Sequence, residues 1–170
     1  HLSDRRQRQM CIRDSCDVEV LIPDFKGDRK AINNIIEASP EVINHNLETV
    51  PRLQREIRTS ASYGRSLSLL HYVKSQGFEG KTKTGLIVGM GESKEEVISV
   101  LKDISKLDVD IVTIGQYLRP TAKHRPIDRY APEEEFENYK LIGESFGISH
   151  VESGPLVRSS YHAKDSFASV

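Results

Sequence analysis

The chain has 170 residues, 37% of them hydrophobic, and a formal net charge of −1. This is enough for one domain with a sizeable core. The near-neutral charge argues against binding to nucleic acid or to a membrane surface, and no apolar run approaches the roughly 20 residues that a membrane span needs. Two cysteines are too few for a disulfide scaffold. These properties predict a soluble intracellular protein.

Residues 1–16 are expected to form an unstructured leader that is not native to the fold. Their few apolar residues fit neither helical nor strand spacing and stand among charges. Cys11 and Cys16 have C-x4-C spacing, but a thiolate cluster or metal site needs about three or four ligands. We therefore interpret the spacing as chance, and expect the folded part to cover residues 17–170.

Strand and helix patterns alternate from residue 17 onward. The predicted strands are residues 18–25, 41–48, 82–89 and 110–118, with a short fifth at 148–152. Asp28 is expected to cap the first helix, Ser62 to begin the second, Ser93 and Glu96 to form a capping box for the third, and Pro132 to open the fourth. This alternation predicts a parallel sheet covered by helices, either a barrel segment or an open doubly wound sheet.

Polar and glycine residues gather at the carboxyl ends of the predicted strands. In chain order they are Asp24, His45, Asn46, Glu48, Gly89, Gly91, Glu92, Gln116 and Tyr117. Taken singly, each is explained by loop chemistry or helix capping. In a parallel β/α fold, however, these ends share one rim, where ligand pockets form. The sequence therefore predicts a pocket at this rim.

Two further segments have both a structural and a functional interpretation. Gly89 and Gly91 would let the backbone approach a flat ligand closely, or they simply make a tight strand-to-helix turn. A dinucleotide fingerprint is excluded because Lys94 stands at its third glycine position. The segment GPLVRSSY near the end of the chain is either a surface tail or a docked extension that holds Arg158 in place.

Five segments, taken together and in this order, resemble the C-terminal half of the lipoyl synthase family of radical S-adenosylmethionine (SAM) enzymes. They are VEVLIPDFKGD, INHNLETVPRLQ, TKTGLIVGMGES, VTIGQYLRPT and SGPLVRSSYHA. RSSY is the most discriminating element, whereas GLIVGMGE is shared with other radical SAM enzymes. The resemblance implies an α/β fold, namely the second half of a partial (β/α)6 TIM-like barrel with a C-terminal extension.

The resemblance also implies a chemistry. Lipoyl synthases insert two sulfur atoms, at C6 and C8 of a protein-bound octanoyl group, using SAM and two 4Fe-4S clusters, of which the auxiliary one is consumed. The implied partners are an octanoylated lipoyl carrier domain or glycine-cleavage H protein, and an electron donor such as ferredoxin or flavodoxin, with no nucleic acid and no membrane. The implied location is the cytoplasm, or the mitochondrial or plastid matrix in a eukaryote.

The family's functional residues carry over to matching positions of this chain. The SAM-binding residues implied in this way are Asn46, Glu48, Gly89, Gly91, Glu92 and Gln116. Ser160 of RSSY matches the residue that binds an iron of the auxiliary cluster, and it is expected to be catalytic together with Arg158.

The sequence departs from the family pattern in two respects. The motifs C-x3-C-x2-C and C-x4-C-x5-C, which hold the two clusters in the family, are absent, and Arg119 stands where the family has Gln. We therefore expect a fragment of a longer enzyme that is inactive by itself. Two alternatives stay open: another radical SAM sulfur-insertion enzyme of the biotin synthase type, and a noncatalytic α/β binding module.

Overall fold

A computed structural model describes residues 17–158 of the chain, so the predicted leader and Ser160 lie outside the described residues. The leader and the domain boundary at residue 17 therefore stay predictions. The elements in chain order are β1 (Glu19–Leu21), η1 (Phe25–Gly27), α2 (Arg29–Glu37), β2 (Val42–Asn44), η2 (Pro51–Leu53), α3 (Gln54–Ile57), α4 (Tyr63–Ser75), β3 (Lys81–Val88), α5 (Lys94–Ser105), β4 (Ile111–Gln116), α6 (Glu133–Ser145) and β5 (His150–Gly154).

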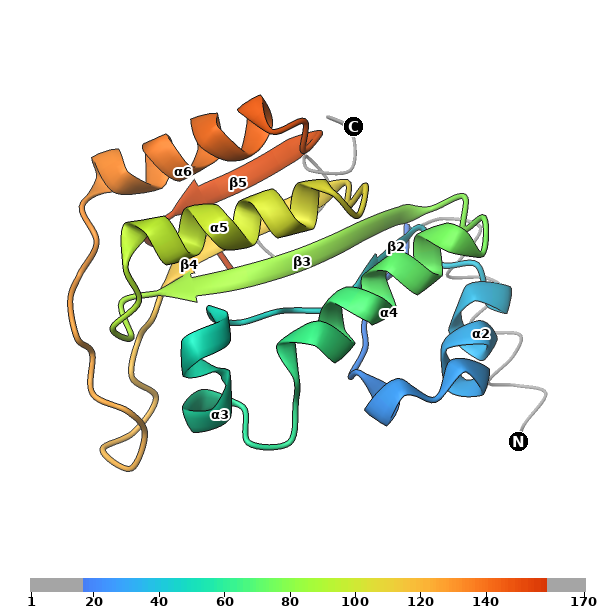
Figure 1. Ribbon diagram of the computed structural model, residues 1–170, viewed down its shortest axis with the longest axis horizontal. Coiled ribbons are helices and arrows are strands. Elements are labelled where there is room, and N and C mark those ends of the chain that lie inside the picture. The colour runs from blue at the N-terminus through green and yellow to red at the C-terminus, as the bar shows by residue number, and fades with distance from the viewer. Residues whose placement is uncertain (1–16, 159–170) are drawn as a thin grey trace.

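The five strands form one sheet in the order β1-β2-β3-β4-β5, and every neighbouring pair is parallel (Figure 1). The predicted parallel sheet with intervening helices is thus confirmed. A doubly wound sheet reverses its strand order at a switch point. Within residues 17–158 no such reversal occurs, because each strand pairs with the next one along the chain.

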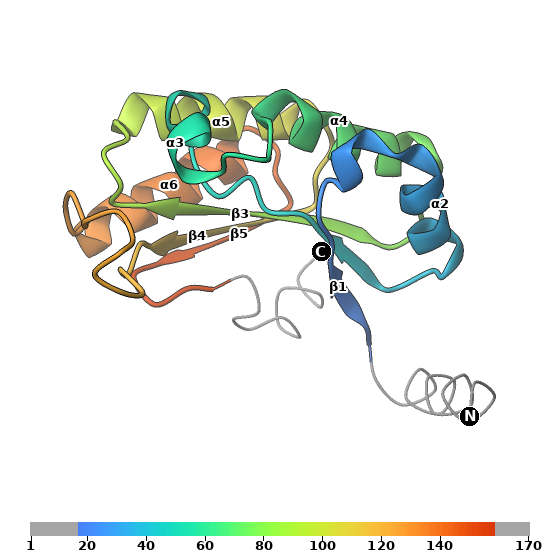
Figure 2. The same cartoon turned by 90° about the horizontal axis from the view of Figure 1, so that it is seen from below.

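The helices cover one face of this sheet. Helices α2, α4 and α5 lie along that face, and α6 packs beside α5 against β5 (Figures 1 and 2). The core lies between the two layers and includes Ile43, Leu70, Val73, Leu86, Val97, Leu101, Val112, Ile114, Phe136, Tyr139 and Val151. Because side chains alternate along a strand, the neighbours of the core residues in β2, β3 and β4 face away from the helices.

Side-chain caps fix the starts of two helices as predicted. The Asp28 carboxylate accepts from the backbone N–H of Lys30 at 2.9 Å, at the start of α2. Ser93 and Glu96 form the predicted capping box of α5, with reciprocal bonds of 3.2 and 2.8 Å. Pro132 lies at the N-cap of α6, one position earlier than expected.

The first strand is shorter than predicted, since β1 ends at Leu21. The Asp24 side chain accepts from the Lys26 N–H at 3.0 Å, which closes a turn. Phe25 and Lys26 in this turn have φ angles of 45° and 53°. Such left-handed conformations cannot continue a strand, so the chain turns directly into α2.

The second strand is interrupted by a bulge. Asn44 pairs with Lys83, whereas Glu48 forms an isolated bridge with Leu86. The chain therefore advances four residues from Asn44 to Glu48 while β3 advances only three. Glu48 has a φ of 66°, and the hydroxyl of Thr84 accepts from the Leu47 N–H that the bulge leaves free. Bulges of this kind re-aim side chains and are common beside functional sites.

A polar cluster lies on the face of the sheet away from the helices. The Lys83 ammonium is 2.9 Å from Glu19 Oε2, and the Asn44 amide donates to Glu19 Oε1 at 2.9 Å. The Lys83 side chain is only 1% exposed. A buried charge of this kind is costly unless an opposite charge compensates it, and the Glu19 carboxylate does so here. Asn44 precedes Asn46 by two residues, and Lys83 precedes Gly85 by two residues. The cluster therefore lies about 7 Å from Asn46 and Gly85, toward the amino ends of the strands.

Candidate functional site

A cavity of about 400 Å³, here called the rim cavity, lies at the carboxyl ends of the central strands. Its lining residues are Leu21, Asn46, Glu48, Gly85, Leu86, Ile87, Thr113, Gly115, Gln116, Tyr117, Leu118, Pro120, Val157 and Arg158. A cavity of about 470 Å³ around Glu41, Phe78 and Lys81 lies at the opposite ends of the strands and contains none of the predicted site residues. The rim cavity is therefore the candidate site.

Asn46, Gly85 and Thr113 form a close-packed part of this cavity. A β-carbon on Gly85 would lie 2.9 Å from both Asn46 Oδ1 and Thr113 Oγ1, so only glycine leaves room for these two side chains. Asn46 donates through Nδ2 to Glu48 Oε1 at 3.1 Å. Its Oδ1 is buried and has no hydrogen-bond partner among residues 17–158. A buried polar atom of this kind costs stability unless a partner is supplied, which favours a bound ligand here.

Arg158 brings a positive charge to the cavity. Val157 N–H donates to Gly154 O at 3.1 Å, which turns the chain after β5. Arg158 Nη1 then donates to the carbonyls of Gln116 and Val157, at 3.3 and 2.8 Å. A β-carbon on Gly115 would lie 2.2 Å from the Val157 carbonyl oxygen. Of the two interpretations of this segment, the docked extension is thus observed as far as residue 158.

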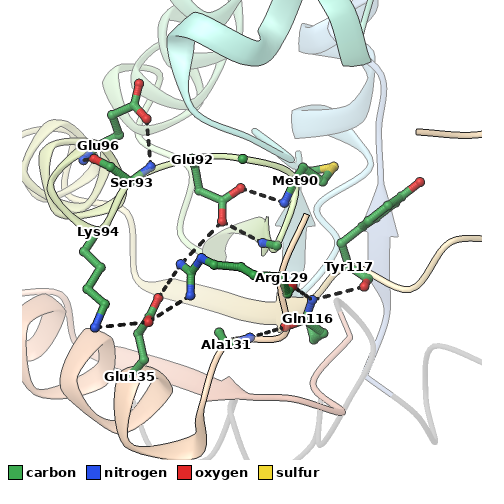
Figure 3. Close-up of polar contacts among 12 residues, drawn as sticks. Met90, Glu92, Ser93, Lys94, Glu96, Gln116, Tyr117, Arg129, Ala131 and Glu135 are labelled. Atoms are coloured by element: carbon green, nitrogen blue, oxygen red, sulfur yellow. Dashed lines mark hydrogen bonds and ion pairs between the residues drawn. The ribbon is translucent and has the colours of Figure 1, made fainter. Parts of the chain in front are cut away.

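Glu92 serves the loop after β3 and is absent from the cavity lining. Its carboxylate accepts from the backbone N–H groups of Gly89 and Met90, at 2.6 and 2.9 Å, and lies 3.7 Å from Arg129 (Figure 3). Its side chain is fully buried. Gly89 and Gly91 have φ angles of 105° and 103°, which glycine adopts readily. These three predicted ligand residues therefore form the hydrogen-bonded turn between β3 and α5, outside the cavity lining.

Gln116 is one of the residues that line the cavity, but its side-chain amide is hydrogen-bonded to other parts of the protein. Nε2 donates to the Arg129 carbonyl at 3.0 Å, and Oε1 accepts from the Ala131 N–H at 2.9 Å (Figure 3). The amide thereby holds the segment that leads into α6. Of the six residues predicted to bind SAM, Asn46, Glu48 and Gln116 line the rim cavity, whereas Gly89, Gly91 and Glu92 do not.

A charge network around the buried Glu135 holds the same segment, and no pattern in the sequence indicated it. Glu135 accepts two hydrogen bonds from Arg129, at 2.9 and 2.6 Å, and one from the Tyr139 hydroxyl at 2.6 Å, and Lys94 lies 3.2 Å away (Figure 3). Burial acts to raise the pKa of the Glu135 carboxyl, but the hydrogen bonds from Arg129, Tyr139 and Lys94 outweigh it and lower this pKa to about 2.

His45 faces the helices and plays a structural part. Its Nδ1 lies 2.8 Å from the Ile22 carbonyl, which can only accept, so Nδ1 carries the proton and Nε2 accepts from the Ser66 hydroxyl at 2.9 Å. Burial lowers the pKa of His45, with a smaller lowering from Arg58 and partial opposition from the Ile22 and Asp24 contacts. The ring is therefore neutral near pH 7.

Between residues 17 and 158, no three His, Cys, Asp or Glu side chains come together as a metal site. None of the helices in this part of the chain combines the length and apolar composition of a membrane span. Ser160, predicted to bind iron, lies outside the described residues.

Sequence comparison shows what the chain is similar to. The profile of the Radical SAM superfamily matches residues 4–104. A lipoyl synthase of Rubrobacter xylanophilus is 55% identical over 150 residues, which cover 88% of this chain and 47% of the relative. A mitochondrial lipoyl synthase of Nematostella vectensis is 54% identical over 147 residues, with coverages of 86% and 50%. The chain thus spans about half the length of the curated relatives it matches.

Solved structures resemble the fold at low sequence identity. Streptococcus suis SuiB matches with a TM-score of 0.62 and 12% identity, over 80% of this chain and 31% of that one. The same protein bound to S-adenosylmethionine gives a TM-score of 0.61 and 13% identity, over 81% and 31%. The superfamily profile covers more than half of the chain, and the matching relatives are lipoyl synthases. The chain therefore belongs to the radical SAM superfamily, and within it resembles the lipoyl synthases.

Proposed function

We propose that this chain is the C-terminal part of a lipoyl synthase and that its rim cavity contributes to the SAM site. The observation that carries the proposal is the rim cavity at the carboxyl ends of the strands, which is lined by Asn46, a residue whose buried Oδ1 has no hydrogen-bond partner among residues 17–158. The high identity to lipoyl synthases supports this family over the biotin synthase type. A cavity is expected of an enzyme and of a noncatalytic binding module alike, so the high identity to lipoyl synthases is also what supports the enzyme over the module.

The residues present fit a SAM molecule. Asn46 Oδ1 and the Glu48 carboxylate are acceptors for its amino or hydroxyl groups, and Arg158 offers a cation for its carboxylate. Gly85 leaves the cavity open where a side chain would fill it. A 4Fe-4S cluster in the whole enzyme would supply the electron for SAM cleavage, and none of the residues of this cavity is assigned to holding it. The loop of Gly89, Gly91 and Glu92 holds the adjacent backbone in place.

The donor set for the two 4Fe-4S clusters does not fit this chain. It has two cysteines in 170 residues, and each cluster needs about three thiolates. We assign no step to a cluster in these residues, and we propose that the chain by itself is inactive. The role of Ser160 as a ligand of the auxiliary cluster remains a proposal for the whole enzyme.

The whole enzyme is proposed to insert two sulfur atoms at C6 and C8 of an octanoyl group held on a lysine. The carrier would be a lipoyl carrier domain or the glycine-cleavage H protein, and the electrons would come from ferredoxin or flavodoxin. The reaction would take place in the cytoplasm, or in the mitochondrial or plastid matrix of a eukaryote.

A test uses the full-length protein that contains this sequence, reconstituted with iron and sulfide under reducing conditions. Mass spectrometry of an octanoylated carrier should show two added sulfur atoms, with one 5′-deoxyadenosine formed per hydrogen removed. Dethiobiotin serves as the competing substrate. Sulfur insertion into dethiobiotin with none into the carrier would replace this proposal by the biotin synthase type, and binding of SAM without any cleavage would favour the noncatalytic module.

A further inference from the structure

Two neighbouring segments at the rim carry a concentration of positive charge, here called the basic corner. It consists of residues 51–58, from Pro51 through α3, and residues 117–130, the loop between β4 and α6. Together these segments contain seven arginines and lysines against two carboxylates, in a chain whose net charge is −1. Helix α6, which follows directly, contains five glutamates and one lysine. The charge of the molecule is therefore strongly polarised.

Specific contacts hold the two segments of the basic corner together. An ion pair between Arg125 and Glu56 joins the loop to α3. The Asp128 N–H donates to the Gly89 carbonyl at 2.9 Å, and Arg129 is bound to Glu135. Figure 1 shows the loop extending away from α6 on the side of the molecule where α3 lies. The positive charges are thus presented from a fixed surface.

Several of these cations have no carboxylate partner among residues 17–158. The exposed side chains of Arg55 and Lys123 make no ion pair or hydrogen bond with described residues. Arg58 and Arg119 reach only backbone carbonyls, with bonds of 3.2 Å to Leu47 and 2.8 Å to His124. Unneutralised cations clustered on one surface favour a partner of opposite charge.

The basic corner is continuous with the mouth of the rim cavity. Tyr117, Leu118 and Pro120 belong to its loop and also line the cavity. Leu118 and Tyr130 are 47% and 69% exposed. Arginine and tyrosine interleaved with apolar side chains are typical of protein interfaces, whereas nucleic-acid surfaces are more uniformly basic. The composition therefore favours an acidic protein as the partner.

We propose that the basic corner docks an acidic face of the protein domain that carries the acyl chain. The acyl group, held on a lysine side chain of that domain, would enter the rim cavity past Leu118 and Pro120. This inference rests on the proposed function, and it adds to it the surface that recognises the carrier and the charge of the carrier's matching face.

The test compares two double charge reversals in the full-length protein. Arg55→Glu with Lys123→Glu alters the corner at two exposed side chains that make no hydrogen bond or ion pair with residues 17–158, so the fold should be kept. Lys30→Glu with Lys102→Glu is the matched control, since both lysines are exposed on α2 and α5, outside the basic corner. The dissociation constant for an octanoylated carrier domain is measured by titration calorimetry at low and at high salt.

The corner variant should bind the carrier about tenfold more weakly at 50 mM NaCl. Each of its two substitutions would turn an attraction between surface charges of the two proteins into a repulsion. The difference should shrink at 300 mM NaCl because salt screens exposed charges, and the control should bind like the parent. Equal weakening by both double variants, or by neither, would overturn the docking surface. Weaker binding of a single-stranded oligonucleotide with unchanged carrier binding would also overturn it. A parent protein that neither binds nor modifies the carrier contradicts the proposed function itself.

Discussion

A β-carbon on Gly89 would lie 2.2 Å from Nε2 of Gln116, so the glycine leaves the space that this amide occupies. From that position Gln116 bonds to the Arg129 carbonyl and the Ala131 N–H. The last side chain of β4 thus ties this strand to the segment before α6, and it occupies the space beside Gly89 in the loop after β3. From the sequence, Gly89 suggested a close approach of the backbone to a ligand. In the structure, this glycine is needed because the Gln116 amide packs against it.

Replacing Gly89 by alanine should therefore destabilise the chain. The φ of 105° is strained for any residue with a β-carbon, and Gln116 would lose its partly buried bond to Arg129 and its buried bond to Ala131. Together these effects should lower the free energy of unfolding by about 2–4 kcal/mol, measured by urea denaturation followed by circular dichroism.

Gly64→Ala provides the control, because a β-carbon there meets nothing within 4 Å and the position lies in α4. Alanine is the better helix former by roughly 1 kcal/mol, so this variant should equal or exceed the parent in stability. A loss of stability at Gly64 as large as that at Gly89 would contradict the steric explanation.

Much of the fold could be predicted from the sequence because its signals are local. Periodicity located the five strands, and Asp28, Ser93 and Glu96 marked two helix starts through short-range capping bonds. The bulge before Glu48 could not be predicted in this way. It depends on a bridge to Leu86, and pairing between distant segments leaves no short-range pattern.

The sequence predicted where the candidate site lies, at the carboxyl ends of the strands, but it did not predict the role of each side chain there. Glu92 and Gln116 stand at strand ends in the sequence, yet their polar atoms are used by backbone groups of neighbouring loops. Gly85 was visible only as part of a motif. Arg129 and Glu135 gave no signal, because their pairing depends on how a long irregular loop folds back.

Asn46→Ala should weaken SAM binding by the full-length protein about tenfold or more. The variant removes the side-chain amide of a cavity-lining residue, and the Oδ1 of this amide has no partner among the described residues. Loss of one or two ligand hydrogen bonds costs about 1–2 kcal/mol. Equilibrium dialysis with labelled SAM measures the effect.

Thr49→Ala is the matched control for Asn46. The Thr49 hydroxyl is also buried without a partner among the described residues, but Thr49 does not line the rim cavity. Its removal should leave SAM affinity unchanged. If Asn46→Ala binds SAM as tightly as Thr49→Ala does, the assignment of Asn46 to the ligand must be abandoned.

Iron–sulfur reconstitution of the 170-residue chain by itself should yield no stable 4Fe-4S cluster. Cys11 and Cys16 are its only cysteines, one fewer than the minimum of about three thiolates. Mössbauer spectra and assays for 5′-deoxyadenosine would test this, with the full-length protein as the positive control. A cluster spectrum accompanied by SAM cleavage in the chain alone would refute the expectation.

Glu135 should make the stability of the chain depend on pH in the acid range. Its pKa falls from an ordinary 4.5 to about 2 in the folded protein. A carboxyl with a lowered pKa stabilises the fold fully above the unfolded value and loses this contribution as the pH falls through the folded value. The stabilisation of about 3 kcal/mol, at about 1.4 kcal/mol per pKa unit, should therefore be complete above pH 5 and disappear toward pH 2.

Glu135→Gln isolates this contribution, because glutamine keeps the shape of the side chain but cannot carry its charge. At pH 7 the variant should be about 3 kcal/mol less stable than the parent, since Arg129 and Lys94 lose their common carboxylate. The stability difference between parent and variant should then narrow as the pH falls from 5 to 2. Glu134→Gln, at the exposed neighbouring position, should keep the pH dependence of the parent. Urea denaturation at several pH values measures all three proteins, and a constant difference between the parent and Glu135→Gln across this range would show that the charge of Glu135 does not stabilise the fold.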